Sequence, residues 1–316
     1  MKLVNLGSTD IKVSPMCFGS LTITPFQSNL PVERGAYLIR YAFDKGVNFI
    51  DTAQLYNNYE YLKKGFQDVP RSDYVVATKT YAWNRELARE ALEGALRSLN
   101  ADYIDVFLLH EQESELTIKG HYEALEYLIQ AKEKGYIRAV GLSTHRITGI
   151  IGANKYPEIE ILHPILNKNG LGIPDGNVED MIENLKISKS LNKGIYSMKP
   201  LGGGHLISEV GESIQFVQNL NLVDSIAIGV QSEEEIDCNV ELIINNNNPK
   251  DQLEKLSYRK RKLIIEDYCI GCGKCVRRCD QKALSIQNGK AKVNREKCVL
   301  CGYCATVCED FYIKVI

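Results

Sequence analysis

Long uncharged apolar runs are missing from this 316-residue sequence. No segment approaches 18 consecutive apolar residues, so no membrane-spanning helix is expected. The start, Met1 to Gly7, lacks a basic stretch followed by an apolar one, so we see no export signal. Positive charge is not in excess either, because the formal net charge is −2, and this gives no reason to propose nucleic acid. We therefore expect a cytoplasmic protein with no membrane or nucleic-acid partner.

Cysteine, in contrast, is abundant and unevenly placed. Eight of the ten cysteines lie between Cys269 and Cys308. Without an export signal, thiolates bound to metal explain them better than disulfides. The other two, Cys17 and Cys238, stand alone and are expected to be small buried hydrophobes.

The C-terminal cysteines form an internal repeat with the spacing C-x2-C-x2-C-x3-C. Cys269, Cys272, Cys275 and Cys279 recur 29 residues later as Cys298, Cys301, Cys304 and Cys308. This segment resembles the bacterial ferredoxins that carry two [4Fe-4S] clusters. The resemblance implies that each fourth ligand comes from the other half, so that one cluster is held by Cys269, Cys272, Cys275 and Cys308, and the other by Cys298, Cys301, Cys304 and Cys279.

Zinc is the competing interpretation of these cysteines. Four-cysteine zinc sites use two separated C-x2-C pairs rather than triplets, so the spacing favours iron–sulfur clusters. The proline that usually follows the fourth cysteine is replaced by Asp280 and Glu309. This replacement keeps the ligands and affects the local turn and the reduction potential.

Upstream, apolar runs alternate with helical patterns, which predicts βαβ units and a parallel sheet. Eight strands, eight helices and an N-terminal hairpin that closes the bottom fit a (β/α)8 TIM barrel over residues 1–245. Residues 246–263, which open with an Asn-rich stretch and include the basic run 259–262, are expected to be a linker. Residues 264–316 are expected to form a small α+β ferredoxin-like domain.

Polar residues follow three consecutive predicted strands. Asp51 and Tyr56 come at the end of one, Lys79 ends the next, and His110 ends the third. The carboxyl ends of barrel strands open onto the active site. In identity and order, these four residues resemble the catalytic tetrad of the aldo-keto reductases, and the resemblance covers residues 1 to about 245.

The resemblance implies carbonyl chemistry with Tyr56 as proton donor. A carbonyl accepts hydride readily only if its oxygen is protonated or strongly hydrogen-bonded. Lys79 is expected to lower the pKa of Tyr56, with Asp51 holding Lys79 and with His110 orienting the carbonyl oxygen. The plainer alternative is a structural Asp–Lys ion pair beside a surface tyrosine.

Further matches imply a nicotinamide coenzyme, NAD(H) or NADP(H). Ser143 fits the family's carboxamide contact, whereas Thr144 replaces the usual Asn, and Gly202 and Gly203 lie in a loop where glycines let a pyrophosphate approach. The segment from Gly229 through Gln231, Ser232 and Glu235 to Asn239 resembles the adenosine-phosphate site. Gln231 and Glu235 stand where NADP-preferring members have Arg or Lys. Without these cations, the site favours NADH or a relaxed coenzyme preference. The plainer alternative is that Glu235 only occupies the first turn of a helix, where carboxylates are favoured anyway.

The predicted function is NAD(P)(H)-linked interconversion of a carbonyl or alcohol substrate, with an electron-transferring iron–sulfur tail. Four histidines at or after strand ends, His110, His145, His163 and His205, leave a metal site as a minor alternative. A redox partner, such as a ferredoxin, flavodoxin or flavoprotein, could dock at Arg277, Arg278 and the basic run 259–262, although such a run is usually a solvated face. The alternative is an electron-transfer or redox-sensing module that docks a flavoprotein or binds nucleotide without turnover.

Overall fold

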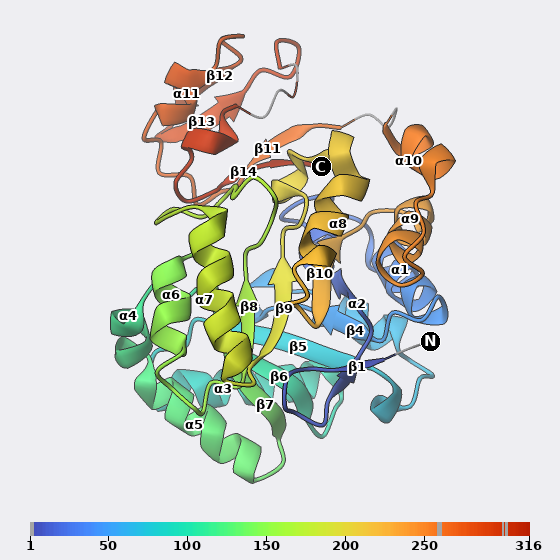
Figure 1. Ribbon diagram of the computed structural model, residues 1–316, viewed down its shortest axis with the longest axis vertical. Coiled ribbons are helices and arrows are strands. Elements are labelled where there is room, and N and C mark those ends of the chain that lie inside the picture. Colours follow the sequence, from blue (N-terminus) through green and yellow to red (C-terminus); the bar gives the residue numbers. More distant parts are fainter. Residues whose placement is uncertain (1–2, 258–260, 299, 301–302) are drawn as a thin grey trace.

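The structure is a computed structural model that describes residues 3–257, 261–298, 300 and 303–316. Eight parallel strands form a closed barrel, in which each strand pairs with its sequence neighbour and the last pairs with the first. Figure 1 shows the helices around this barrel and the small C-terminal domain above one end of it. The barrel strands are β3 (Met16–Gly19), β4 (Phe49–Asp51), β5 (Val75–Thr80), β6 (Ile104–Leu109), β7 (Ile137–Thr144), β8 (Ile161–Pro164), β9 (Gly194–Met198) and β10 (Ser225–Gly229).

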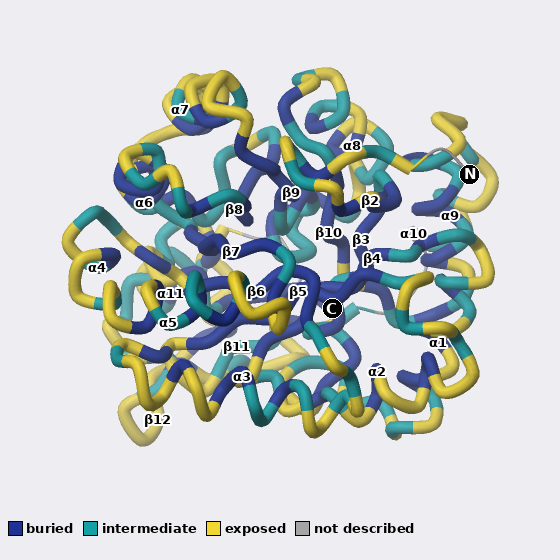
Figure 2. Tube along the Cα trace, turned by 90° about the horizontal axis from the view of Figure 1, so that it is seen from below, coloured by how far each residue is buried: buried dark blue, intermediate teal, exposed yellow. Residues whose placement is uncertain are grey.

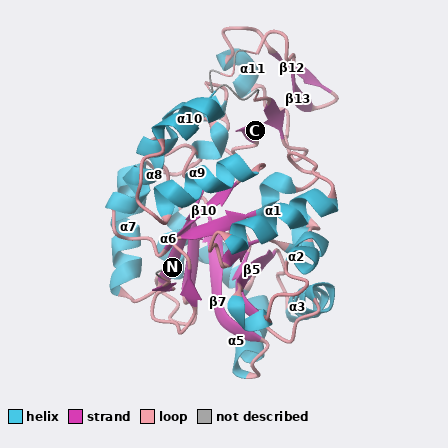
Figure 3. Cartoon of the chain, turned by 90° about the vertical axis from the view of Figure 1, so that its right-hand side faces the viewer, coloured by secondary structure: helices cyan, strands magenta, loops and turns pink. Residues whose placement is uncertain are grey.

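The helices follow the strands as the sequence predicts for a (β/α)8 barrel. They are α1 (Val32–Asp44), α2 (Tyr59–Gly65), α3 (Arg85–Leu99), α5 (Tyr122–Glu133), α6 (Ile147–Ala153), α7 (Val178–Ser190), α8 (Val210–Asn219) and α9 (Glu233–Ile243). Among the described residues before the C-terminal domain, α4 (Glu115–Gly120) and α10 (Lys250–Ser257), the latter within the expected linker, were not predicted. In Figure 3 the helices surround the strands, and in Figure 2 the strands are buried while the outer turns are exposed.

The barrel has two apolar layers because successive strand residues face opposite sides. One core lies between the strands and the surrounding helices. The second fills the barrel interior, where Phe49, Ala77 and Leu108 pack together with Cys17. The hairpin of β1 (Val4–Asn5) and β2 (Lys12–Val13) contributes its own apolar residues to this interior core, so it closes the bottom as predicted.

The C-terminal domain is joined to the barrel by a two-stranded antiparallel sheet. β11 (Leu263–Ile265) pairs with β14 (Ile313–Val315), so the entry and exit of this domain lie side by side. Between them lie α11 (Lys274–Arg278), the hairpin of β12 (Leu284–Gln287) and β13 (Lys290–Val293), and the short helix η6 (Ala305–Val307). Figure 1 places β11 and β14 between the barrel and these outer elements.

Candidate active site and coenzyme groove

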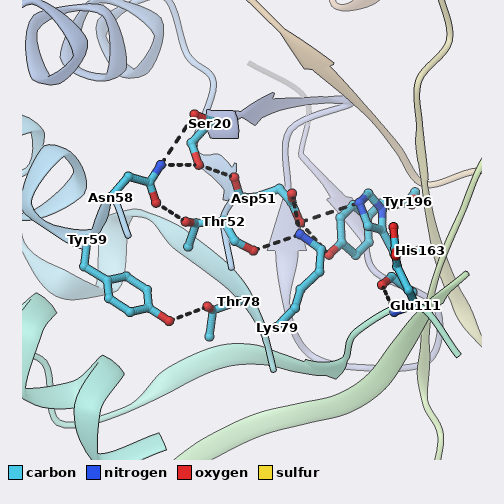
Figure 4. Close-up of polar contacts among 11 residues, drawn as sticks. Ser20, Asp51, Thr52, Asn58, Tyr59, Thr78, Lys79, Glu111, His163 and Tyr196 are labelled. Carbon is cyan, nitrogen blue, oxygen red and sulfur yellow. Dashed lines mark hydrogen bonds and ion pairs between the residues drawn. The ribbon is translucent and has the colours of Figure 1, made fainter. Parts of the chain in front are cut away.

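The strand alternation that fills the barrel core also aims polar side chains at its mouth. Asp51 and Lys79 come two residues after the core residues Phe49 and Ala77, so they point inward one layer higher. Lys79 Nζ lies 2.7 Å from Asp51 Oδ2 and donates to the Thr52 carbonyl at 2.8 Å. Both side chains are buried, with exposed fractions of 1% for Lys79 and 7% for Asp51. Figure 4 shows this pair at the centre of the polar network.

Asp51 has two further partners that the sequence did not reveal. Tyr196, on β9, donates its phenol hydrogen to Asp51 Oδ1 at 2.9 Å. His163 Nε2 lies 3.6 Å from the same oxygen, and its ring stacks on Tyr196 with 3.9 Å between centroids. Burial lowers the pKa of His163 to about 4, so it is neutral near pH 7. The carboxylate of Asp51 is therefore fixed from several sides.

Tyr56 lies beside this pair at the end of the short helix η2 (Gln54–Tyr56). The Lys79 ammonium is 5.1 Å from the centre of the Tyr56 ring, and the ring of His110 is 5.9 Å from it. The structure thus brings together all four predicted catalytic residues. Burial, and then the Asp51 carboxylate, raise the pKa of Tyr56 well above its usual value, so the phenol is protonated in this arrangement. This direction differs from the expected lowering by Lys79.

His110 completes the mouth on the side of β6. Burial, and then the nearby Lys79 cation, lower its pKa well below the usual value, so the imidazole is neutral. Its Nδ1 is buried and has no hydrogen-bond partner among the residues that the structure describes. The ring of Tyr81 stacks on it at 4.4 Å. A neutral imidazole fixed by stacking suits a hydrogen bond to a ligand oxygen.

A second polar cluster lies next to the tetrad. Lys199, after β9, has its Nζ 2.9 Å from His145 Nε2, and His145 Nδ1 is 3.6 Å from Glu111. Burial, and then the cation of Lys314, lower the pKa of Lys199 to about 7. Lys314 belongs to β14 and is itself 4% exposed. A side chain of the C-terminal domain therefore reaches the mouth of the barrel.

One cavity of about 200 Å³ extends from the tetrad along the barrel mouth. Asp51, Tyr56 and His163 line one end, and Asn239 and Glu235 line the other. The C-terminal residues Lys314 to Ile316 form part of its wall. Ligand pockets usually measure roughly 300–1,000 Å³, so the cavity in this arrangement is small for a ligand the size of a dinucleotide.

The predicted nicotinamide contacts lie at the mouth but already have partners. Ser143 Oγ accepts a hydrogen bond from the Glu111 backbone at 2.9 Å. Thr144 Oγ1 accepts from the Arg146 backbone amide at 2.9 Å. These bonds shape the loop after β7. Their roles toward a coenzyme stay predictions.

Two of the three glycines in the predicted pyrophosphate loop, η4 (Gly202–Gly204), are covered by the C-terminal segment, whereas Gly202 packs against Leu171 and Leu206 of the barrel. A Cβ built on Gly204 would lie 1.9 Å from the Val315 carbonyl oxygen, and one on Gly203 would lie 2.8 Å from the Lys314 side chain. All three glycines have positive φ. The space that was expected to admit a pyrophosphate is used by the protein's own strand.

At the adenosine end, Glu235 is already paired. It accepts from Arg261 Nη1 at 3.0 Å and from the Gln231 backbone at 2.7 Å. Ser232 caps α9 by accepting from the Glu235 amide, and Asn239 is buried on the next turn. Gly229 approaches Thr22 so closely that a Cβ would be 1.8 Å from its hydroxyl. In this arrangement, the residues at the pyrophosphate and adenosine ends do not fit a bound dinucleotide.

Four cysteines from the two halves of the C-terminal repeat lie together. Burial raises the pKa of the Cys275 thiol, and the nearby thiolates of Cys308, Cys269 and Cys272 raise it further, which indicates that the four side chains are near one another. Backbone amides donate to the sulfurs of Cys269 at 3.4 Å and of Cys308 at 3.3 Å. This proximity fits the first predicted cluster, in which Cys308 crosses over from the second half.

The second predicted set is only partly described. Cys279, Cys298 and Cys304 are described, and Cys301 lies outside the described residues. Within the described part of the chain, no three His, Cys, Asp or Glu side chains converge on a single-ion site. The second set therefore stays a prediction.

Comparison with known proteins identifies the class. The aldo/keto reductase family model matches residues 15–248, so the chain belongs to this family, and a 4Fe-4S dicluster domain matches residues 261–309. The chain is 28% identical to L-galactose dehydrogenase from Arabidopsis thaliana over 67% of this chain and 68% of that protein. It is 27% identical to D-arabinose 1-dehydrogenase from Saccharomyces cerevisiae over 60% of this chain and 63% of that protein, which is less than two thirds of it.

Solved structures confirm the barrel. An aldo-keto reductase from Bacillus halodurans, in its holo form, superposes with a TM-score of 0.67 at 21% identity. The match covers 81% of this chain and 96% of that one. Across the described residues, no helix is both long and apolar enough to cross a membrane.

Sequence reasoning missed the residues that come from distant segments. Tyr196 could have been found, because it lies on the inward face of β9 by the same alternation that places Asp51. Lys314 and Arg261 had no comparable signal. Their contacts depend on how the C-terminal domain docks on the barrel.

Proposed function

We propose that this aldo/keto reductase family member interconverts a small-molecule carbonyl and an alcohol, with NAD(H) or NADP(H) as the redox coenzyme. The observation that carries the proposal is the buried Asp51–Lys79 pair beside Tyr56 and His110 at the mouth of the barrel. A structural ion pair needs only its two charged residues, whereas here the ring of Tyr56 also lies beside Lys79 and the ring of His110 beside Tyr56. Members named for sugar oxidation, such as the Arabidopsis and yeast enzymes, support a hydroxylated substrate class.

These residues account for the proton that carbonyl reduction needs. As charge develops on the carbonyl oxygen, Tyr56 gives it the phenol proton, and the Lys79 cation stabilises the phenolate that remains. A raised pKa keeps Tyr56 protonated before the reaction, and Asp51 holds the Lys79 side chain in place. Neutral His110 donates a hydrogen bond to the same oxygen. In the oxidation direction, the phenolate takes the proton from the alcohol.

The C-terminal domain is proposed to hold two [4Fe-4S] clusters that exchange electrons one at a time. Anaerobically purified protein should contain about eight irons per chain, and Cys308→Ser should lower this toward about four by damaging the cluster of Cys269, Cys272 and Cys275. Cys238→Ser, outside the repeat, is the matched control. Stoichiometric zinc, or iron unaffected by Cys308→Ser, would contradict the proposal.

A redox partner is proposed for these clusters. Arg277 is exposed on α11, and Arg278 lies 3.4 Å from Asp280. Arg261 is not available for docking, because it is paired with Glu235, which corrects its expected role, and Arg259 and Lys260 lie outside the described residues. Arg277→Glu should slow cluster reduction by a ferredoxin or flavodoxin and leave reduction by dithionite unchanged.

Turnover by the full chain tests the proposal. Under anaerobic conditions, a panel of aldehydes, ketones and sugar alcohols is incubated with NADH or NADPH at millimolar concentration, and both coenzyme absorbance and cluster EPR are followed. Substrate-dependent coenzyme oxidation supports the proposal. Cluster redox changes with any partner protein, but no turnover on any substrate, would support the second candidate, a redox-sensing module, which the covered glycine loop favours.

A further inference from the structure

The C-terminal strand β14 lies where the proposed coenzyme would place its pyrophosphate. Val315 contacts the loop so closely that even a methyl group on Gly204 would overlap its backbone. His205, the next residue, has its Nε2 3.1 Å from the Ile313 carbonyl. The strand is thus bound to the glycine loop along its length and not at one point.

Phe311 anchors the same segment beside the loop. Its side chain is 1% exposed, and Lys199 Nζ lies 5.1 Å from its ring centre. A Cβ on Gly172 would be 2.9 Å from this ring, so the loop after β8 also fits around it. Two loops of the barrel mouth, the one after β8 and the one after β9, therefore hold residues 311–316.

The adenosine end is closed by a second contact from the same domain. Arg261, two residues before β11, pairs with Glu235 on α9, and the exposed fractions of the two side chains are only 12% and 10%. The neighbouring residue Lys262 exchanges backbone hydrogen bonds with Ile316 at 2.8 and 3.0 Å. Because these bonds extend the β11–β14 sheet, Arg261 and the strand form one structural unit.

We propose that this unit, Arg261 together with residues 311–316, and a dinucleotide are mutually exclusive occupants of the groove. The inference rests on the proposed function, because it takes the groove as the coenzyme site. In the arrangement described here, the C-terminal domain blocks the site, and a dinucleotide binds only when β14 leaves the glycine loop. Access to the barrel's active site is thus controlled by the position of the iron–sulfur domain.

The opposite arrangement has a distinct signature. If β14 were a permanent wall of the coenzyme site, Lys314 would contribute a cation to the pyrophosphate, and weakening the strand would weaken binding. If β14 competes, weakening it strengthens binding, because apparent affinity falls in proportion to the fraction of open chains. The sign of the change separates the two.

The experiment uses the full-length, cluster-loaded chain with Val315→Asp, which puts a charge on a side chain that is 6% exposed against the barrel. Ile286→Asp is the matched control, because Ile286 lies on the outer strand β12 and is 41% exposed. Binding of NADH and of NADPH is measured by calorimetry under anaerobic conditions. We expect Val315→Asp to bind dinucleotide at least about tenfold more tightly than wild type, as for a groove open in one chain of ten. Ile286→Asp should match wild type.

Weaker or equal binding by Val315→Asp would overturn the competition while leaving the proposed coenzyme intact. Absence of binding in every variant would overturn the competition and the coenzyme assignment together, so the two failures are distinguishable. Hydrogen exchange on the wild-type chain gives an answer that needs no variant. Saturating NADH should accelerate exchange of the backbone amides of residues 313–316, and protection of these amides would contradict the proposal.

Discussion

The two ends of the groove use charge in opposite ways. At the carbonyl end, Asp51 and Lys79 come from adjacent strands and satisfy each other within the barrel. At the adenosine end, Glu235 belongs to the barrel and its partner Arg261 to the C-terminal segment. The first arrangement is built into the barrel, whereas the second depends on docking. We therefore call the end with Asp51 and Lys79, which is proposed to be catalytic, the permanent end, and the end with Glu235 and Arg261, which is proposed to hold the coenzyme, the conditional end.

The largest effect should come from breaking the permanent end. Lys79→Met leaves the Asp51 carboxylate buried without its cation, so we expect a loss of about 3–5 kcal/mol in the free energy of unfolding. Urea unfolding followed by circular dichroism measures it. The double variant Lys79→Met/Asp51→Asn should recover part of the loss, since it removes the charge as well. Lys64→Ala, which breaks an exposed pair with Glu33, should leave the midpoint unchanged.

Tyr56→Phe tests chemistry at the same end without disturbing the ion pair. Because it removes the proton donor, kcat should fall at least about 100-fold, while dinucleotide affinity stays the same. Steady-state kinetics on a confirmed substrate, with binding measured separately, checks both. Tyr59→Phe is the control, since its hydroxyl bonds Thr78 outside the cavity. Wild-type turnover by Tyr56→Phe would exclude the tetrad mechanism.

The buried histidine at the carbonyl end predicts a pH dependence. His163 has a folded pKa of about 4, against roughly 6.5 when unfolded, so between these values the unfolded chain binds a proton that the folded chain does not. Stability is therefore lost as pH falls through this window, by up to about 1.4 kcal/mol per unit. His163→Gln should flatten the slope of unfolding free energy against pH by that amount. An unchanged slope would mean that His163 stays accessible to protons in the fold.

The smallest effect is expected at the conditional end. Glu235→Arg breaks the pair with Arg261 and adds a cation, so NADPH affinity should rise about fivefold more than NADH affinity, because only NADPH carries the 2′-phosphate. Calorimetry with both coenzymes measures it. Glu234→Arg, on the exposed side of the same helix turn, is the control. Equal gains for both coenzymes would show that Glu235 does not face the 2′ position.

The permanent end could be predicted from sequence because its determinants are local. Asp51, Lys79 and His110 each end a short apolar run, and strand alternation then fixes the side of the barrel they face. Helix periodicity predicts helices over 85–98 and 233–244, and α3 and α9 begin at these positions and end within one residue of them. The short helix α4 carries too few turns for such a pattern.

The conditional end could not be predicted, because it depends on contacts between distant segments. The glycines at 202–204 predict that another group lies close to this backbone. Glycine alone does not show whether that group is the phosphate of a ligand or the backbone of another segment of the chain. His205 and Ile313 are 108 positions apart in sequence. Glu235 looked like a specificity residue, and only the fold shows its partner.

The two-stranded attachment of the C-terminal domain restricts how its clusters could travel. A domain on a single flexible linker can swing between sites, as mobile carrier domains do. Here the described residues of the outer part of the domain lie between β11 and β14 (Figure 1), which are paired with each other from Leu263–Val315 to Ile265–Ile313. Rotation about one strand would break the pairing with the other, so the domain moves as a hinged block or does not move. The proposed redox partner is accordingly expected to approach the outer face of the domain.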